Sequence, residues 1–219
     1  MAQLSESGLI DSHLIETSGL PLAEKINEAF RALPADCEYI GWLGDDDILL
    51  PVALEAAAKV LDENPEVVMI YGGCDYISTT DEVLFTNSSS KFAAKLLSFG
   101  PQLIPQPGSL WRRSAFEKVG ALSGDFNLAF DFDLFLKLAK VGELRFIPQT
   151  LAQFRWHPDS LSVKRRWVSV SEASRVRRKH YKGPMKALWP LWEPFVMIAT
   201  WFAGKLVTQR ARFLQARAK

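Results

Sequence analysis

Short continuous apolar runs alternate, over the first part of the chain, with segments whose apolar residues recur every three or four positions. The helical spacing appears at residues 21–33, which Pro34 ends, and again after Pro51 at residues 53–61. Residues 39–43 and 67–71 are continuous apolar runs typical of buried strands, and Gly72-Gly73 is expected to end the second run. This alternation predicts an α/β sheet with a largely parallel core.

The elements that follow are less regular. The sequence predicts an antiparallel excursion at residues 75–87 with its turn at 79–82, short helices at 92–99 and 114–119, and a proline-rich loop at 101–109. An apolar stripe at helical spacing predicts a stronger helix at 131–141, and extended pieces are expected at 144–148 and 151–156. Ligands of such sheets lie at the carboxyl ends of the strands, so the loops there are the candidates for chemistry.

Three consecutive carboxylates, Asp45, Asp46 and Asp47, follow Gly44 at the end of the apolar run 39–43. Because adjacent carboxylates repel one another, a hard divalent cation with oxygen ligands would relieve the cost of holding them together. The alternative is a strand-to-helix turn in which Asp47 caps the helix and the other two are solvated.

The net charge of +1 conceals two regions of opposite sign. Residues 1–163 hold 12 Lys and Arg against 23 Asp and Glu, whereas residues 164–219 hold 14 against 2. A basic tail on an acidic body indicates an anionic surface as its partner, either membrane lipid or nucleic acid. Cys37 and Cys74 lack metal-site spacing, and residues 1–12 do not resemble a secretory signal, so a reducing cytoplasm is the default location.

Within the basic tail, residues 187–204 form an apolar run flanked by Lys186 and Lys205 and interrupted by two prolines and Glu193. The run is short for a membrane-spanning helix, so a segment lying in the membrane interface over residues 186–205 fits better. The alternative is a C-terminal helix packed on the body or on a partner. A nucleic-acid arm is disfavoured because the cations are interleaved with a Trp-rich run and no recognition motif is visible.

Three segments together resemble the large family 2 of inverting glycosyltransferases, which have the GT-A fold. The first is EYIGWLGDDDILLP (38–51), which is similar to the strand, DxD-type metal turn and helix of that family. The second is QPGSLWRRSAFEKVGAL (106–122), which is similar to its acceptor-side loop and helix. The third is FDFDLFLKL (130–138), which is similar to its second acidic motif and is followed by FRWHPDSLS (154–162). Their order makes the resemblance specific over about residues 20–163. It implies a GT-A-like (Rossmann-like) mixed sheet with flanking helices.

The resemblance also divides the chain into a partial glycosyltransferase core at 1–163 and a basic, Trp-rich helical tail at 164–219. The first part of the family's catalytic domain, which holds the nucleotide base, has no counterpart in residues 1–20. The core is therefore expected to be N-terminally incomplete and to expose a sheet edge, which could bind a protein partner or a second copy.

On the donor side, the resemblance implies a Mn²⁺ or Mg²⁺ that neutralises the diphosphate of a nucleotide sugar. Asp46 is the first choice as metal ligand, and Asp45 would contact the metal or the ribose. His157 would be a further metal or diphosphate contact, although it could equally be a histidine hydrogen-bonded within a loop. Asp47 and Arg155 are assigned to the donor diphosphate, although Arg155 could simply pair with the acidic body.

On the acceptor side, the resemblance implies that Asp131 is the catalytic base, with Asp133 as a supporting acid. From the residues themselves, both carboxylates would serve equally well to complement the dipole of their helix. The acceptor side would be lined by Gln106, Ser109, Trp111 and Arg112, although Trp111 could equally be a core residue.

The function expected is metal-dependent transfer of a sugar, with inversion, from a nucleotide-sugar donor to a glycan or lipid-linked acceptor of the cell envelope. The location expected is cytoplasmic, peripheral on the inner face of the cell membrane. The first alternative is a non-catalytic, truncated glycosyltransferase-like subunit that acts by binding a partner. The second is a two-metal phosphoryl-transfer enzyme that shares metals between the two acidic clusters.

Overall fold

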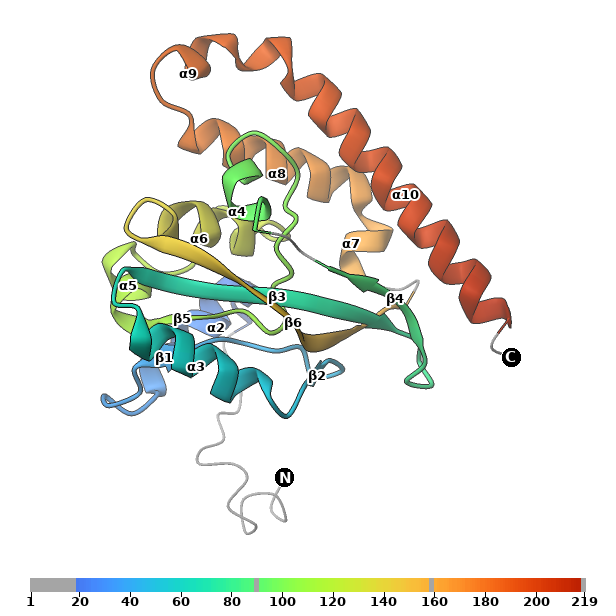
Figure 1. Ribbon diagram of the computed structural model, residues 1–219. Helices are drawn as coiled ribbons and strands as arrows, with labels where there is room; N and C mark the ends of the chain where they lie inside the picture. Colours follow the sequence, from blue (N-terminus) through green and yellow to red (C-terminus); the bar gives the residue numbers. More distant parts are fainter. Residues whose placement is uncertain (1–18, 89–90, 158–159, 218–219) are drawn as a thin grey trace.

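A computed structural model describes residues 19–88, 91–157 and 160–217 of the chain. Residues 1–18, on which the expectation about a secretory signal rests, and Pro158 and Asp159 lie outside the described residues. The two strongest helical patterns are confirmed as α2 (Leu22–Ala32) and α3 (Ala53–Glu63) (Figure 1). Each buries one apolar face, and α3 begins two residues after Pro51.

The sheet is mixed rather than largely parallel. Its described strands are β1 (Tyr39–Ile40), β2 (Ile48–Leu49), β3 (Val67–Ile77), β4 (Val83–Asn87), β5 (Leu110–Arg112) and β6 (Glu143–Arg155). They lie in the order β1-β5-β3-β6-β2, with β4 paired to β3. The pairing of β3 with β6 is parallel, and the other pairings in the described residues are antiparallel. The short strand β5, which was not predicted, separates β1 from β3.

Two predicted breaks in the strands are wrong. Strand β3 continues through Gly72-Gly73 as far as the predicted hairpin, and the two extended pieces at 144–148 and 151–156 form the single strand β6. A Cβ atom on Gly72 would lie 2.6 Å from the carbonyl oxygen of Gln149 and 2.6 Å from Cγ of Leu151. Glycine is therefore required here because β6 approaches closely at a shift in the β3–β6 register.

The remaining helices of the body are α4 (Ala93–Leu96), α5 (Arg113–Lys118) and α6 (Phe130–Leu138). They confirm the helices predicted near 92–99, 114–119 and 131–141; α4 and α6 are shorter than predicted, and α5 is shifted by one residue. Helix α5 is followed by Val119 and then by Gly120. The φ of Gly120 is 82°, a left-handed conformation that glycine commonly adopts just after a helix.

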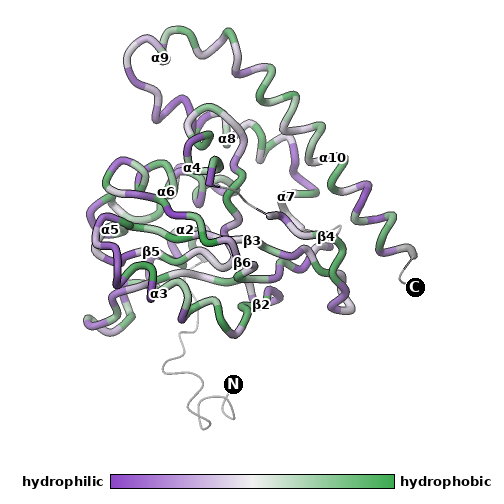
Figure 2. The backbone as a smooth tube through the Cα atoms, viewed as in Figure 1, coloured by the Kyte–Doolittle hydropathy of each residue, from purple (hydrophilic) through white to green (hydrophobic). Residues whose placement is uncertain are grey.

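The basic tail is helical and packs against the body. It contains α7 (Leu161–Lys164), α8 (Arg166–His180), α9 (Pro184–Leu188), the 3-10 helix η1 (Trp189–Leu191) and the long helix α10 (Glu193–Arg217). Figure 1 shows α10 running back along α8 toward β4. Hydrophobic stretches of α10 are interrupted by hydrophilic residues, which are more frequent in its C-terminal half (Figure 2). Over the three described stretches, no helix combines the length and apolarity needed to cross a membrane.

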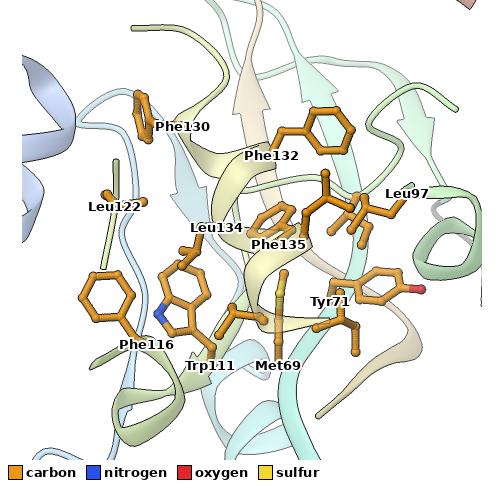
Figure 3. Close-up of a cluster of buried hydrophobic side chains, with 14 of the residues drawn as sticks. Met69, Tyr71, Leu97, Trp111, Phe116, Leu122, Phe130, Phe132, Leu134 and Phe135 are labelled. Carbon is orange, nitrogen blue, oxygen red and sulfur yellow. The ribbon is translucent and has the colours of Figure 1, made fainter. Parts of the chain in front are cut away.

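The main core lies between the sheet and α6 (Figure 3). Phe132 and Phe135 of α6 are fully buried with Met69 and Tyr71 of β3 and with Trp111 of β5. The ring of Trp111 meets that of Phe135 edge to face at 6.4 Å. This packing places the N-terminal end of α6, which carries the second acidic motif, beside the chain that leads out of β1.

Candidate active site

The acidic turn, residues 44–47, connects β1 to β2 and is closed by a hydrogen bond from the amide of Asp47 to the carbonyl of Gly44, at 3.2 Å. Oδ1 of Asp47 accepts a hydrogen bond from the amide of Arg155 at 3.0 Å, which ties the turn to the end of β6. Burial raises the pKa of Asp47, and the neighbouring charge of Asp46 raises it further. Asp47 does not cap a helix, because α3 begins at Ala53 with Val52 before it.

Arg155 holds the acidic turn against the β3–β4 hairpin. Its Nε donates to the carbonyl of Asp46 at 2.9 Å, and its Nη1 donates to the carbonyl of Ser78 at 2.9 Å. Its Nη2 forms an ion pair with Asp81 at 2.7 Å. One planar guanidinium therefore spans three acceptors from two loops, which a lysine could not do.

The carboxylate of Asp46 faces the imidazole of His157. The distance from Oδ2 to Nε2 is 3.6 Å, and the side chains are 43% and 35% exposed, so both are accessible to a ligand. Asp45 is also exposed at the tip of the turn. In the part of the chain that the structure describes, no three His, Cys, Asp or Glu side chains are arranged to hold a metal. Two accessible side chains that could ligate a divalent ion, Asp46 and His157, therefore lie together at this turn.

Asp131 lies in the first turn of α6 and is partly buried. Its Oδ2 accepts a hydrogen bond from Nε2 of Gln102 at 2.7 Å, and its Oδ1 accepts one from the amide of Phe132 at 2.8 Å. Burial raises the pKa of Asp131, and these two hydrogen bonds act in the opposite direction. A carboxylate with a raised pKa and a fixed orientation can take up a proton from a bound hydroxyl group.

The proline-rich loop at residues 101–109 connects the two acidic motifs. At one end Gln102 holds Asp131, and at the other Nε2 of Gln106 donates to the carbonyl of Trp42 at 2.7 Å, two residues before the acidic turn. Ser109 donates to the carbonyl of Pro105 at 2.6 Å and helps to line an apolar cavity of about 250 Å³ beside β1 and α3. Sequence reasoning missed Gln102, because no periodicity or motif marks an orienting residue within an irregular loop.

The structure separates three of the predicted site residues from this arrangement. Asp133 is fully buried and faces α8, where Nε2 of His180 lies at 2.8 Å; Nζ of Lys137, one turn further along α6, lies at 2.9 Å. Trp111 is in the core, and Arg112 donates to backbone carbonyls around the end of α3, among them that of Val67 at 2.8 Å. Asp131 and Asp133 diverge because residues two apart point to opposite sides of a helix.

No known protein-family profile matches the sequence. The chain is 29% identical over 138 residues to a protein of Rickettsia conorii described as an uncharacterized glycosyltransferase; the match covers 58% of this chain and 22% of that protein. It is 24% identical over 166 residues to an uncharacterized glycosyltransferase of Haemophilus influenzae, covering 73% of this chain and 55% of that protein. The chain thus spans about a fifth and about half of the lengths of these relatives.

Among solved structures, the fold is similar to that of S. aureus TarS, with a TM-score of 0.52, 11% sequence identity, and 82% of this chain and 34% of TarS covered. A crystal structure of TarS residues 1–349 in complex with UDP gives a TM-score of 0.52 at 14% identity and covers 82% of this chain and 52% of that one. The predicted mixed α/β fold with flanking helices is therefore confirmed, and it is the fold of a glycosyltransferase. In sequence and in fold, the chain is similar to glycosyltransferases.

Proposed function

We propose that the chain forms the metal-binding and acceptor-side part of an inverting glycosyltransferase of family 2, which transfers a sugar from a nucleotide-sugar donor to a glycan or lipid-linked acceptor at the cytoplasmic face of the cell membrane. One observation carries the proposal. A pair of accessible ligands, Asp46 and His157, and an oriented carboxylate of raised pKa, Asp131, lie on segments that one loop joins.

Asp46 and His157 would hold Mn²⁺ or Mg²⁺, with Asp45 within the same turn. An imidazole among the ligands favours Mn²⁺ over Mg²⁺. When bound, such an ion neutralises the charge of the nucleotide diphosphate as it leaves the sugar. Arg155 acts as a positioning residue, because it fixes the backbone of Asp46 rather than reaching outward.

Asp131 acts as the general base. The oxygen of an acceptor hydroxyl group attacks the anomeric carbon, the bond from that carbon to the diphosphate breaks, and the hydroxyl proton passes to the carboxylate of Asp131. Gln102 keeps this carboxylate oriented. The transfer rate is expected to fall as the pH is lowered through the raised pKa of Asp131, because only the ionised form accepts the proton; a rate that is constant across that range would contradict the assignment.

The donor's nucleotide needs a further surface. Strand β1 pairs with β5 and, among the described strands, has no partner on its other side. This free edge is the place where a protein partner or a second copy would add a strand.

The proposal is tested by measuring Mn²⁺ retention by electron paramagnetic resonance in the absence and presence of UDP. UDP should increase the Mn²⁺ bound to the wild type, and Asp46→Asn should lower that binding by about tenfold or more. The matched control is Asp36→Asn, the same change at an exposed carboxylate before β1, which should behave as the wild type. Equal retention by the wild type and by Asp46→Asn would overturn the metal site.

Release of UDP from UDP-glucose and UDP-N-acetylglucosamine separates the enzyme from the non-catalytic alternative. Asp131→Asn should retain Mn²⁺ and UDP but lose the release of UDP. A wild type that binds Mn²⁺ and UDP without releasing UDP from either probe would favour a binding subunit.

A further inference from the structure

Helix α10 presents mostly small and polar residues to the protein, together with Leu214, and turns most of its large apolar residues to the outside. The side chains that α10 buries include Glu193, Thr208 and Ala211. Gly204 also faces the body, since a Cβ atom there would lie 3.1 Å from Nη1 of Arg166. A helix that packs only onto its own domain has the opposite arrangement, with its apolar stripe turned inward.

The outward apolar residues form a single stripe. At about 100° per residue, they fall within an arc of roughly 80° that also contains the polar Gln209. The outer stripe consists of Phe195, Ile198, Phe202, Leu206 and Phe213, all of which are more than half exposed. Leu188 and Leu191, just before α10, are exposed as well. An exposed apolar patch of this continuity marks a contact surface.

The charges around the outer stripe are of one sign. The acidic residues of 164–217 are Glu172 and Glu193, and both are buried. Glu172 accepts hydrogen bonds from the amides at residues 127–129, and both Glu193 carboxylate oxygens pair with Arg177. This part of the described surface therefore carries exposed cations, among them Lys186, Lys205 and Arg212, and no exposed carboxylate.

The buried ion pair explains how a carboxylate can occur within the apolar run. Arg177 and Glu193 are 1% and 0% exposed, and Tyr181 donates a further hydrogen bond to Glu193 at 3.0 Å. Because Glu193 is neutralised inside the protein, it does not oppose contact between the outer stripe and an apolar, anionic environment.

We propose that the outer stripe of α10 inserts into the interface of an anionic lipid bilayer, with Lys205 and Arg212 at the level of the headgroups. Apolar residues flanked by cations have the composition of an interfacial helix. The acidic body, with 12 basic against 23 acidic residues over 1–163, is repelled by such a surface, so the protein is oriented with α10 toward it. A symmetric pairing of α10 with a second copy is less favourable because it brings like charges together. The surface extends beyond the expected segment 186–205 to Phe213, and it does not depend on the proposed sugar transfer.

Co-sedimentation with vesicles tests the proposal. The full chain should bind phosphatidylcholine vesicles that contain about 30 mol % phosphatidylglycerol about tenfold more tightly than pure phosphatidylcholine vesicles, and salt should weaken this binding. Phe202→Asp should reduce the binding by about tenfold or more. The matched control is Leu22→Asp, because Leu22 is 53% exposed in the first turn of α2 and Phe202 is 54% exposed. The double variant Lys205→Glu, Arg212→Glu should abolish the preference for the anionic vesicles.

Three results would overturn the proposal. The first is the absence of wild-type binding to the anionic vesicles, or a loss of binding in Leu22→Asp as large as the loss in Phe202→Asp. The second is a dimer, seen by light scattering, that Phe202→Asp dissociates while no vesicle is bound, which would identify a second copy as the occupant. The third is a wild type that binds duplex DNA in a salt-sensitive way but does not bind vesicles, with the DNA binding unchanged in Phe202→Asp.

Discussion

Replacing Asp133 by asparagine tests the buried charge that joins α6 to α8. The carboxylate of Asp133 is 0% exposed. Nε2 of His180 lies 2.8 Å from it, Nζ of Lys137 lies 2.9 Å from it, and Nζ of Lys179 lies 3.6 Å from it. Nδ1 of His180 lies within hydrogen-bond distance of Nζ of Lys140, and Nε2 of His180 is the nitrogen that donates to Asp133.

The magnitude follows from the pKa of Asp133. Burial raises this pKa, but the hydrogen bonds from His180 and Lys137 more than offset burial and lower it from 3.8 to about 2. Because one pKa unit corresponds to about 1.4 kcal/mol, the ionised carboxylate contributes about 2–3 kcal/mol to the free energy of unfolding at neutral pH. Breaking a fully buried pair costs about 3–5 kcal/mol, but Lys137 and Lys179 are partly exposed and can turn to water. We expect Asp133→Asn to destabilise the protein by about 2–3 kcal/mol.

Urea denaturation at a series of pH values is the assay. The folded-state pKa of Asp133 lies below the unfolded value, so its contribution is present above about pH 4 and is lost as the pH falls toward 2. The difference between the wild type and Asp133→Asn should therefore shrink over that range. Asp125→Asn is the control, since Asp125 is an exposed partner of the same Lys179, and it should leave the urea midpoint unchanged. A pH-independent difference, or none at about pH 7, would refute the reasoning.

Three further changes test the packing and the site. Gly72→Ala should lower the free energy of unfolding by about 1–3 kcal/mol in a chemical denaturation experiment, because the added methyl group meets β6 at 2.6 Å. Glu193→Gln leaves the buried Arg177 guanidinium without a counter-charge. The free energy of unfolding should fall by about 3–5 kcal/mol in the same experiment. Arg155→Lys should weaken the binding of Mn²⁺ in the presence of UDP by about tenfold, because lysine cannot hold the acidic turn and the hairpin together.

Two matched controls accompany these changes. Gly73→Ala places its Cβ at 3.4 Å, an ordinary contact distance, and should cost less than the change at the neighbouring glycine. Arg145→Lys alters another arginine of β6, whose partners are the exposed Glu66 and Glu143, and should leave Mn²⁺ binding unchanged. Equal effects within either pair would show that the change of residue type, and not the contact described, is responsible.

Local pattern determined much of this protein. The spacing of apolar residues in α2, α3 and α6 predicted those helices, because burying one face of a helix requires residues three and four apart. The acidic turn was likewise found from its residues. The resemblance predicted the mixed α/β fold that the likeness to TarS confirms. The roles of Asp46, His157 and Asp131 stay predictions.

Tertiary structure decided what depends on partners distant in the chain. The sequence does not reveal that β6 passes close enough to Gly72 to keep it in a strand, or that β5 lies between β1 and β3, because register is set by neighbouring strands. Nor does it distinguish Asp131, which Gln102 orients, from Asp133, which the cations of α6 and α8 neutralise. The orientation of α10 was also beyond the sequence: the apolar face of a helix is recognisable from its periodicity, but whether that face is turned inward or outward depends on where its buried charge finds a partner.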